Sequence, residues 1–165
     1  MRILGVDPGT RRTGYGVLEL VGDRLTLVTC GAITTRARDP VSLRLKTIHE
    51  RLAEIIAACR PEALALEEAY YGKSVPSAIR IGEARAIALL CAAQAGIPVF
   101  EYPPAVVKKA SVGVGTAHKS QVQTMVQRIL GLAAPPEPED AADALAIAIC
   151  HCHRVLWGAG RGAGQ

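Results

Sequence analysis

Three short strand-like segments occupy the start of the chain, and this feature constrains the fold most strongly. Apolar residues alternate or run together at about 2–7, 14–20 and 25–33, separated by glycine and charged residues. Pro8-Gly9 and Gly22-Asp23 supply turn residues between the segments. The chain is therefore predicted to open with an antiparallel meander of three strands.

Helical and strand patterns alternate in the rest of the chain. Apolar residues recur at helical spacing from Ser42, the predicted N-terminal cap, until just before Pro61. Short apolar runs predict a central strand at 63–66 and a fifth strand at 97–102, whose proline favours a sheet edge. Further helices are expected at about 76–95, 103–110, 118–130 and 138–156. The sequence predicts an α/β fold, a mixed five-stranded sheet of order 3-2-1-4-5 flanked by helices.

Composition indicates one cytoplasmic domain. Of the 165 residues, 50% are hydrophobic, which fits a single domain at 1–157, with a flexible glycine-rich tail at 158–165. The chain has neither a signal-peptide pattern nor an apolar run long enough for a membrane span. Its five cysteines are scattered through apolar segments and are expected to be reduced. The run 150–153, Cys-His-Cys-His, does not fit zinc because successive helical residues point in different directions.

Four acidic residues are predicted to converge. Asp7 ends the first strand and Glu67 ends the fourth, and these strands are neighbours in the predicted order. Asp140 and Asp143 are three apart and share one face of the last helix. Asp143 precedes the apolar run 144–149, so it lies on a helix that must be largely buried, where an unpaired acid is costly. Taken singly, three of these acids could be purely structural, as a turn former at Asp7, a solvated strand end at Glu67 and a helix-dipole acid at Asp140.

Together the acids indicate a metal site. The four acids do not each have an arginine or lysine beside them in the sequence. Their mutual repulsion would therefore be relieved by divalent cations. Carboxylate oxygens suit Mg²⁺, with Mn²⁺ as a possible substitute, and two such ions suit displacement at phosphorus. Setting the four acids aside leaves 11 acidic residues against 19 basic ones. A basic shell around an acidic pocket is what a metal-dependent enzyme acting on a polyanion requires.

Several motifs in register resemble one family. Asp7-Pro-Gly-Thr, Thr13-Gly-Tyr-Gly-Val and Ala65-Leu-Glu67 are followed by Glu101-Tyr, by Gly113-Val-Gly-Thr-Ala-His-Lys119, and by Asp140-Ala-Ala-Asp143. From Met1 to about His153 the chain resembles the RuvC Holliday-junction resolvases. The resemblance implies an RNase H-like fold, a homodimer, and Mg²⁺-dependent paired nicks at four-way DNA junctions in recombination and repair. It also implies the branch-migration proteins RuvA and RuvB as partners.

The resemblance carries functional roles onto particular residues. The catalytic and metal-binding acids would be Asp7, Glu67, Asp140 and Asp143, with Glu68 as second choice. The residues expected to face DNA are Tyr70, an aromatic three positions after Glu67 where the family often has phenylalanine, and Lys108 and Lys119. Gly113 and Gly115 could let backbone amides approach a phosphate, although a glycine pair is equally typical of a flexible loop. The small-residue helix at 76–95 is the expected dimer interface.

Other functional classes are open on the residues alone. One is another RNase H-like nuclease acting on RNA or hybrids. A second is an actin-like phosphate-binding ATPase, because Asp7-Pro-Gly-Thr followed by Gly14-Tyr-Gly resembles its first phosphate motif, but the chain supplies no second lobe. A third is a junction-binding protein without chemistry, which an incomplete acid set would indicate; here all four acids are present.

Overall fold

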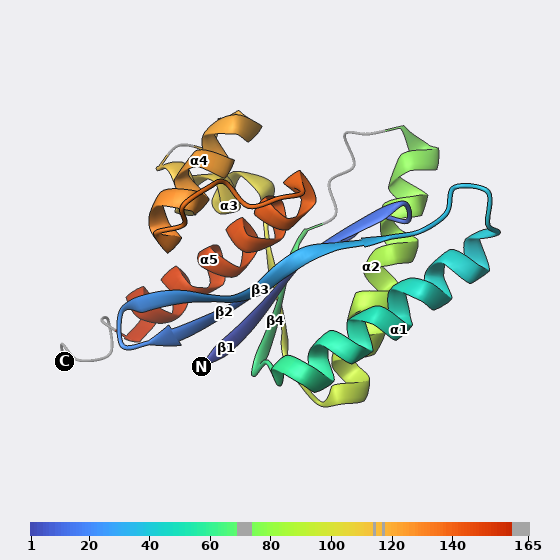
Figure 1. The fold of residues 1–165 in the computed structure, drawn as a ribbon, viewed down its shortest axis with the longest axis horizontal. Helices are drawn as coiled ribbons and strands as arrows, with labels where there is room; N and C mark the ends of the chain where they lie inside the picture. Colours follow the sequence, from blue (N-terminus) through green and yellow to red (C-terminus); the bar gives the residue numbers. More distant parts are fainter. Residues whose placement is uncertain (69–73, 114, 117, 160–165) are drawn as a thin grey trace.

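The molecule is a three-layer structure with a central sheet and helices on each face (Figure 1). The computed structural model describes residues 1–68, 74–113, 115–116 and 118–159. β1 (Arg2–Asp7), β2 (Arg12–Val21) and β3 (Arg24–Thr34) form the predicted antiparallel meander. β4 (Ala63–Glu67) pairs in parallel with β1 and with the edge strand β5 (Val99–Tyr102). The observed order β3-β2-β1-β4-β5 confirms the predicted sheet.

The helices divide between the two faces. α1 (Val41–Cys59) and α2 (Val75–Ala95) pack together on one face, over a core that includes Leu4 and Leu64. α5 (Glu139–Ala159) crosses the other face, with α3 (Pro104–Val112) and α4 (Lys119–Leu130) packed beside it (Figure 1). Among the described residues, no helix has both the length and the apolar character that a membrane crossing requires.

Two helix ends differ from the sequence-based expectation. α1 begins at Val41 with Pro40 in the capping position, so the prediction of Ser42 as the cap is wrong. Pro40 has a φ of −53° and a ψ of 149° and offers no side-chain capping hydrogen bond, so α1 begins without one. α5 continues to Ala159, beyond the expected end of the last helix near 156. Residues 160–165 lie outside the described residues, and the division at 157/158 into domain and flexible tail stays a prediction.

Glycines in β1 and β2 let α5 lie unusually close to the sheet. A Cβ atom on Gly5 would collide with the carbonyl oxygen of Ala144, and one on Gly14 would collide with that of Asp140. Only a residue without a side chain permits such an approach between a strand and a helix backbone. The first turns of α5 are therefore held against the edge of the sheet at which β1 ends.

Candidate active site

The four predicted acids come from three elements that meet at one edge of the sheet. In the parallel β1–β4 ladder Val6 pairs with Leu66, so Asp7 and Glu67 follow at the same edge. Gly14, which pairs with Asp7 across β1 and β2, is also the residue on which the backbone of Asp140 rests. Asp143 lies one helical turn further along α5. The sheet register and the close α5 contact therefore bring residues distant in sequence together.

The electrostatics of Asp7 show how closely the acids are gathered. Its pKa rises from 3.8 to about 7, first because burial removes water from the carboxylate. The negative charges of Asp143, Glu67 and Asp140 raise it further, and the charge of Lys119 offsets part of the effect. An acidic site with this much repulsion favours the arrival of positive charge.

Two basic residues from other parts of the chain reach into the acid cluster. Lys119, at the start of α4, places Nζ 2.8 Å from Oδ2 of Asp143. The hydrogen bond with Asp143 is also the main reason that the pKa of Lys119 is raised. Arg12, at the start of β2, places Nη1 3.6 Å from Oδ2 of Asp140. No sequence pattern indicates either contact, since neither base is a sequence neighbour of its acid.

The loop that follows Asp7 is fixed by side chains on both sides. Thr13 Oγ1 donates a hydrogen bond to the carbonyl oxygen of Gly9 at 2.8 Å. Arg44 is 4% exposed and donates from Nη2 to Thr10 Oγ1 at 2.8 Å and from Nε to the Thr10 carbonyl at 3.0 Å. This arginine was not among the residues predicted from the sequence. The available signal was its place one turn before Ile48 on the buried stripe of α1.

A buried pair behind the site joins β5 to α5. Tyr102 pairs with Glu67 in the β4–β5 ladder, and its carbonyl oxygen accepts the backbone N–H of Glu68 at 2.8 Å. Its hydroxyl lies 2.6 Å from Nδ1 of His151. Burial lowers the pKa of His151, which favours the neutral ring. The strand end that carries Glu67 is thus connected through Tyr102 to the helix that carries Asp140.

Comparison with known proteins identifies the family. The family model for RuvC, crossover junction endodeoxyribonuclease, matches residues 3–151. The chain belongs to the RuvC family. A curated relative, the crossover junction endodeoxyribonuclease RuvC of Pelotomaculum thermopropionicum, is 50% identical over 157 residues, covering 95% of this chain and 96% of the relative. The RuvC of Chloroflexus aggregans is 52% identical over 153 residues and covers 93% of both chains.

A solved structure supports the same conclusion. The structure of Thermus thermophilus RuvC in complex with Holliday junction substrate matches with a TM-score of 0.90 and 38% identity over 96% of both chains. The fold of this RuvC-family chain is RNase H-like, as the sequence resemblance predicted. As a member of the family, the chain is a nuclease that hydrolyses DNA.

The acids of this RuvC-family chain match the chemistry of a hard divalent cation. They offer only carboxylate oxygens, the ligands that Mg²⁺ prefers. Across residues 1–68, 74–113, 115–116 and 118–159, no group of three His, Cys, Asp or Glu side chains is already arranged around one ion position. The donor type and the repulsion at Asp7 fit a magnesium site, while the ion pair of Lys119 with Asp143 holds a cationic group within the cluster.

The remaining predicted residues lie in different places. Glu68 is exposed just after β4, and Lys108 is half-buried on α3. Gly113 ends α3 with a φ of +88°, which glycine adopts readily, and Gly115 lies beside Ala105. Among the described residues, Lys119 forms ion pairs with Glu139 and Asp143, whereas Lys108 takes part in none. Tyr70 lies outside the described residues.

Proposed function

We propose that this RuvC-family nuclease, a Holliday junction resolvase, cuts four-way DNA junctions by paired symmetric nicks in strands of like polarity. The reaction would depend on Mg²⁺, with Mn²⁺ as a possible substitute, and would serve recombination and repair in the cytoplasm. The observation that supports this proposal is the gathering of Asp7, Glu67, Asp140 and Asp143 at one sheet edge. The rise in the pKa of Asp7 to about 7 indicates a site that favours added positive charge.

The four acids would hold the metal. When bound, Mg²⁺ would supply Lewis-acid stabilisation at the scissile phosphate and lower the pKa of the attacking water. Asp7 would give up its proton as positive charge enters the cluster, because the repulsion that raises its pKa is relieved. Lys119 would exchange its contact with Asp143 for a DNA phosphate, and Arg12 would hold the carboxylate of Asp140 in place. The products would be a 5′ phosphate and a 3′ hydroxyl.

Other residues would bind the junction. Lys108 and Lys119 would neutralise phosphates, which makes binding dependent on salt. Gly113 and Gly115 would let backbone N–H groups approach a phosphate. Tyr70 would stack on bases at the branch point, a contact worth about 1–3 kcal/mol per base in comparable cases.

Resolution of a junction would require two copies of the chain. One acid cluster cuts one strand, whereas a junction needs two symmetric cuts, so a two-fold homodimer matches the substrate. α2 is the proposed interface: its exposed apolar side chains include Val75, Ile79 and Leu90. Family resemblance adds RuvA and RuvB, the branch-migration proteins, as partners of the dimer.

A cleavage assay on three substrates tests the proposal. A synthetic four-way junction, a linear duplex and an RNA–DNA hybrid are incubated with Mg²⁺ or with EDTA. We expect cleavage of the junction alone, only with Mg²⁺, and no cleavage by Asp7→Asn although junction binding survives. Glu50→Gln, an exposed change on α1, is the matched control and should cut normally. Preferred cleavage of the hybrid would support the alternative nuclease class, and normal cleavage by Asp7→Asn would remove Asp7 from the site.

A further inference from the structure

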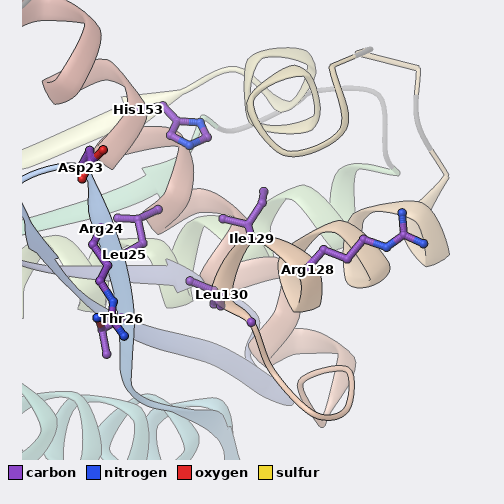
Figure 2. Close-up of a pocket in the computed structure, with 9 residues that line it drawn as sticks. Asp23, Arg24, Leu25, Thr26, Arg128, Ile129, Leu130 and His153 are labelled. Carbon is purple, nitrogen blue, oxygen red and sulfur yellow. The ribbon is translucent and has the colours of Figure 1, made fainter.

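A pocket lies between the β2–β3 hairpin and the end of α4. Figure 2 shows Arg24 and Leu25 of β3 on one side, Ile129 and Leu130 of α4 on the other, and His153 of α5 above them. The space has a volume of about 450 Å³. We name it the hairpin pocket.

The hairpin pocket lies at the opposite end of the sheet from the acid cluster. The hairpin end of β2 adjoins the start of β1, since the N–H of Leu20 donates to the Met1 carbonyl at 2.8 Å. Asp7 ends the same strand, about 17–20 Å further along at the usual rise per residue. Along α5, the helical rise per residue separates Asp143 from His153 by roughly 15 Å. The pocket is therefore a second location, distinct from the proposed cutting site.

The lining of the hairpin pocket combines apolar side chains with basic ones. Leu25, Ile129 and Leu130 are partly buried and pack against the core below α5. Arg24 and Arg128 are exposed, with the side chain of Arg128 extending outward from α4 (Figure 2), and none of the ion pairs among the described residues includes either one. Against these two cations the lining contains a single acid, Asp23. This charge balance favours a ligand that is acidic and carries an apolar side chain.

An exposed aromatic residue adjoins the hairpin pocket. The ring of Trp157 stacks on that of His153, with centroids 5.3 Å apart, and Trp157 is 61% exposed. Tryptophan and arginine are the residues most enriched among the energetic anchors of protein interfaces. β3 is also an outer strand of the sheet, where an extended peptide can form main-chain hydrogen bonds.

We propose that the hairpin pocket docks an acidic, extended segment of a protein partner. The acidic side chains of that segment contact Arg24 and Arg128, and an apolar side chain enters the pocket against Leu25 and Ile129. DNA fits this surface less well, because the apolar side chains of Leu25, Ile129 and Leu130 have no counterpart in a sugar–phosphate backbone. The position of the pocket lets a partner bind while the acid cluster engages a junction.

Direct binding of defined peptides tests the docking proposal. The probes are a fluorescent peptide of alternating glutamate and leucine, its charge-reversed counterpart of lysine and leucine, and a labelled DNA duplex. Binding is measured by anisotropy, and Trp157, the single tryptophan of the chain, reports the location through its emission. Arg24→Ala and Arg128→Ala are compared with Arg51→Ala, an exposed arginine on α1.

We expect saturable binding of the acidic peptide, a change in Trp157 emission, and affinity about tenfold lower in each pocket variant but unchanged in Arg51→Ala. Junction cleavage by Arg24→Ala should stay at the level of the unmodified chain, so failure here is separable from failure of the resolvase proposal. Equal binding of the charge-reversed peptide, or no saturable binding of the acidic one, overturns the proposal. Loss of duplex affinity, rather than peptide affinity, in Arg24→Ala would identify a nucleic-acid surface instead.

Discussion

Asp7 shows how a single side chain can link function to a stability cost. A carboxyl group whose pKa is raised from 3.8 to about 7 holds its proton more tightly in the folded than in the unfolded chain. Between these pH values the folded state binds more protons, so stability falls as pH rises. A metal-binding cluster of this kind is expected to weaken the metal-free fold at neutral pH.

Urea unfolding in EDTA measures this effect. For the unmodified chain we expect Asp7 to lower the free energy of unfolding by about 1.4 kcal/mol per pH unit between 5 and 6, and by less as the pH approaches 7. Asp7→Asn should lack this contribution and be the more stable protein at pH 7. The buried His151 and the half-buried His153 have lowered pKa values and act in the opposite direction, so the comparison of the two proteins isolates Asp7. Equal pH slopes in both would contradict the expectation.

Replacement of Lys119 should affect both stability and DNA binding, because this residue contacts Asp143 and is also proposed to contact DNA. Lys119→Ala should lower the melting temperature of the metal-free chain, since Asp143 loses its counter-charge beside three other acids. It should also weaken junction binding and reduce the slope of log affinity against log salt by about one. Lys46→Ala, which removes an exposed lysine from α1, is the control. An unchanged salt slope would show that Lys119 does not contact DNA.

At the scale of elements, the close packing of α5 against β2 sets the position of Asp140 in the site. The backbone of Asp140 rests directly on Gly14, so any Cβ at that position must push the helix away from β2. Gly14→Ala is expected to cost several kcal/mol of stability through overpacking and to reduce cleavage strongly by displacing Asp140. Gly158→Ala is the matched control, because nothing lies within 4 Å of a Cβ at this position near the end of α5. Normal melting temperature and cleavage in Gly14→Ala would contradict this account of how the site is built.

The arrangement of whole strands and helices is the part of the structure that the sequence predicted best. The sheet order followed from local signals, such as the turn at Gly22-Asp23 and the short apolar run of β4. The convergence of Asp7 and Glu67 then followed from the order of the strands. The contact of Lys119 with Asp143 did not, because contacts between distant polar residues leave no periodic pattern. The capping error at Ser42 arose because a serine and a proline are both good helix starters, and only the backbone decides between them.

At the scale of the whole molecule, the proposed paired nicks require two acid clusters at one junction, and α2 is the surface proposed to join them. It presents an exposed stripe of apolar and small residues at helical spacing: Val75, Ile79, Gly82, Ala86 and Leu90. Ile79 is 57% exposed near the amino end of this stripe. Small residues let two helices approach closely, and burial of such a stripe against a second copy would remove apolar surface from water.

Ile79→Glu tests the dimer and the paired nicks together. A carboxylate within a helix–helix contact must be desolvated, so we expect dimer affinity to fall about 100-fold, which corresponds to about 3 kcal/mol. Leu43→Glu places the same charge on an exposed position of α1 and should leave the dimer intact. Sedimentation equilibrium measures association, and a plasmid carrying a cruciform separates single nicks from linearisation by two cuts. A variant that stays dimeric, or a monomer that still linearises the plasmid, would contradict α2 as the surface that couples the two cuts.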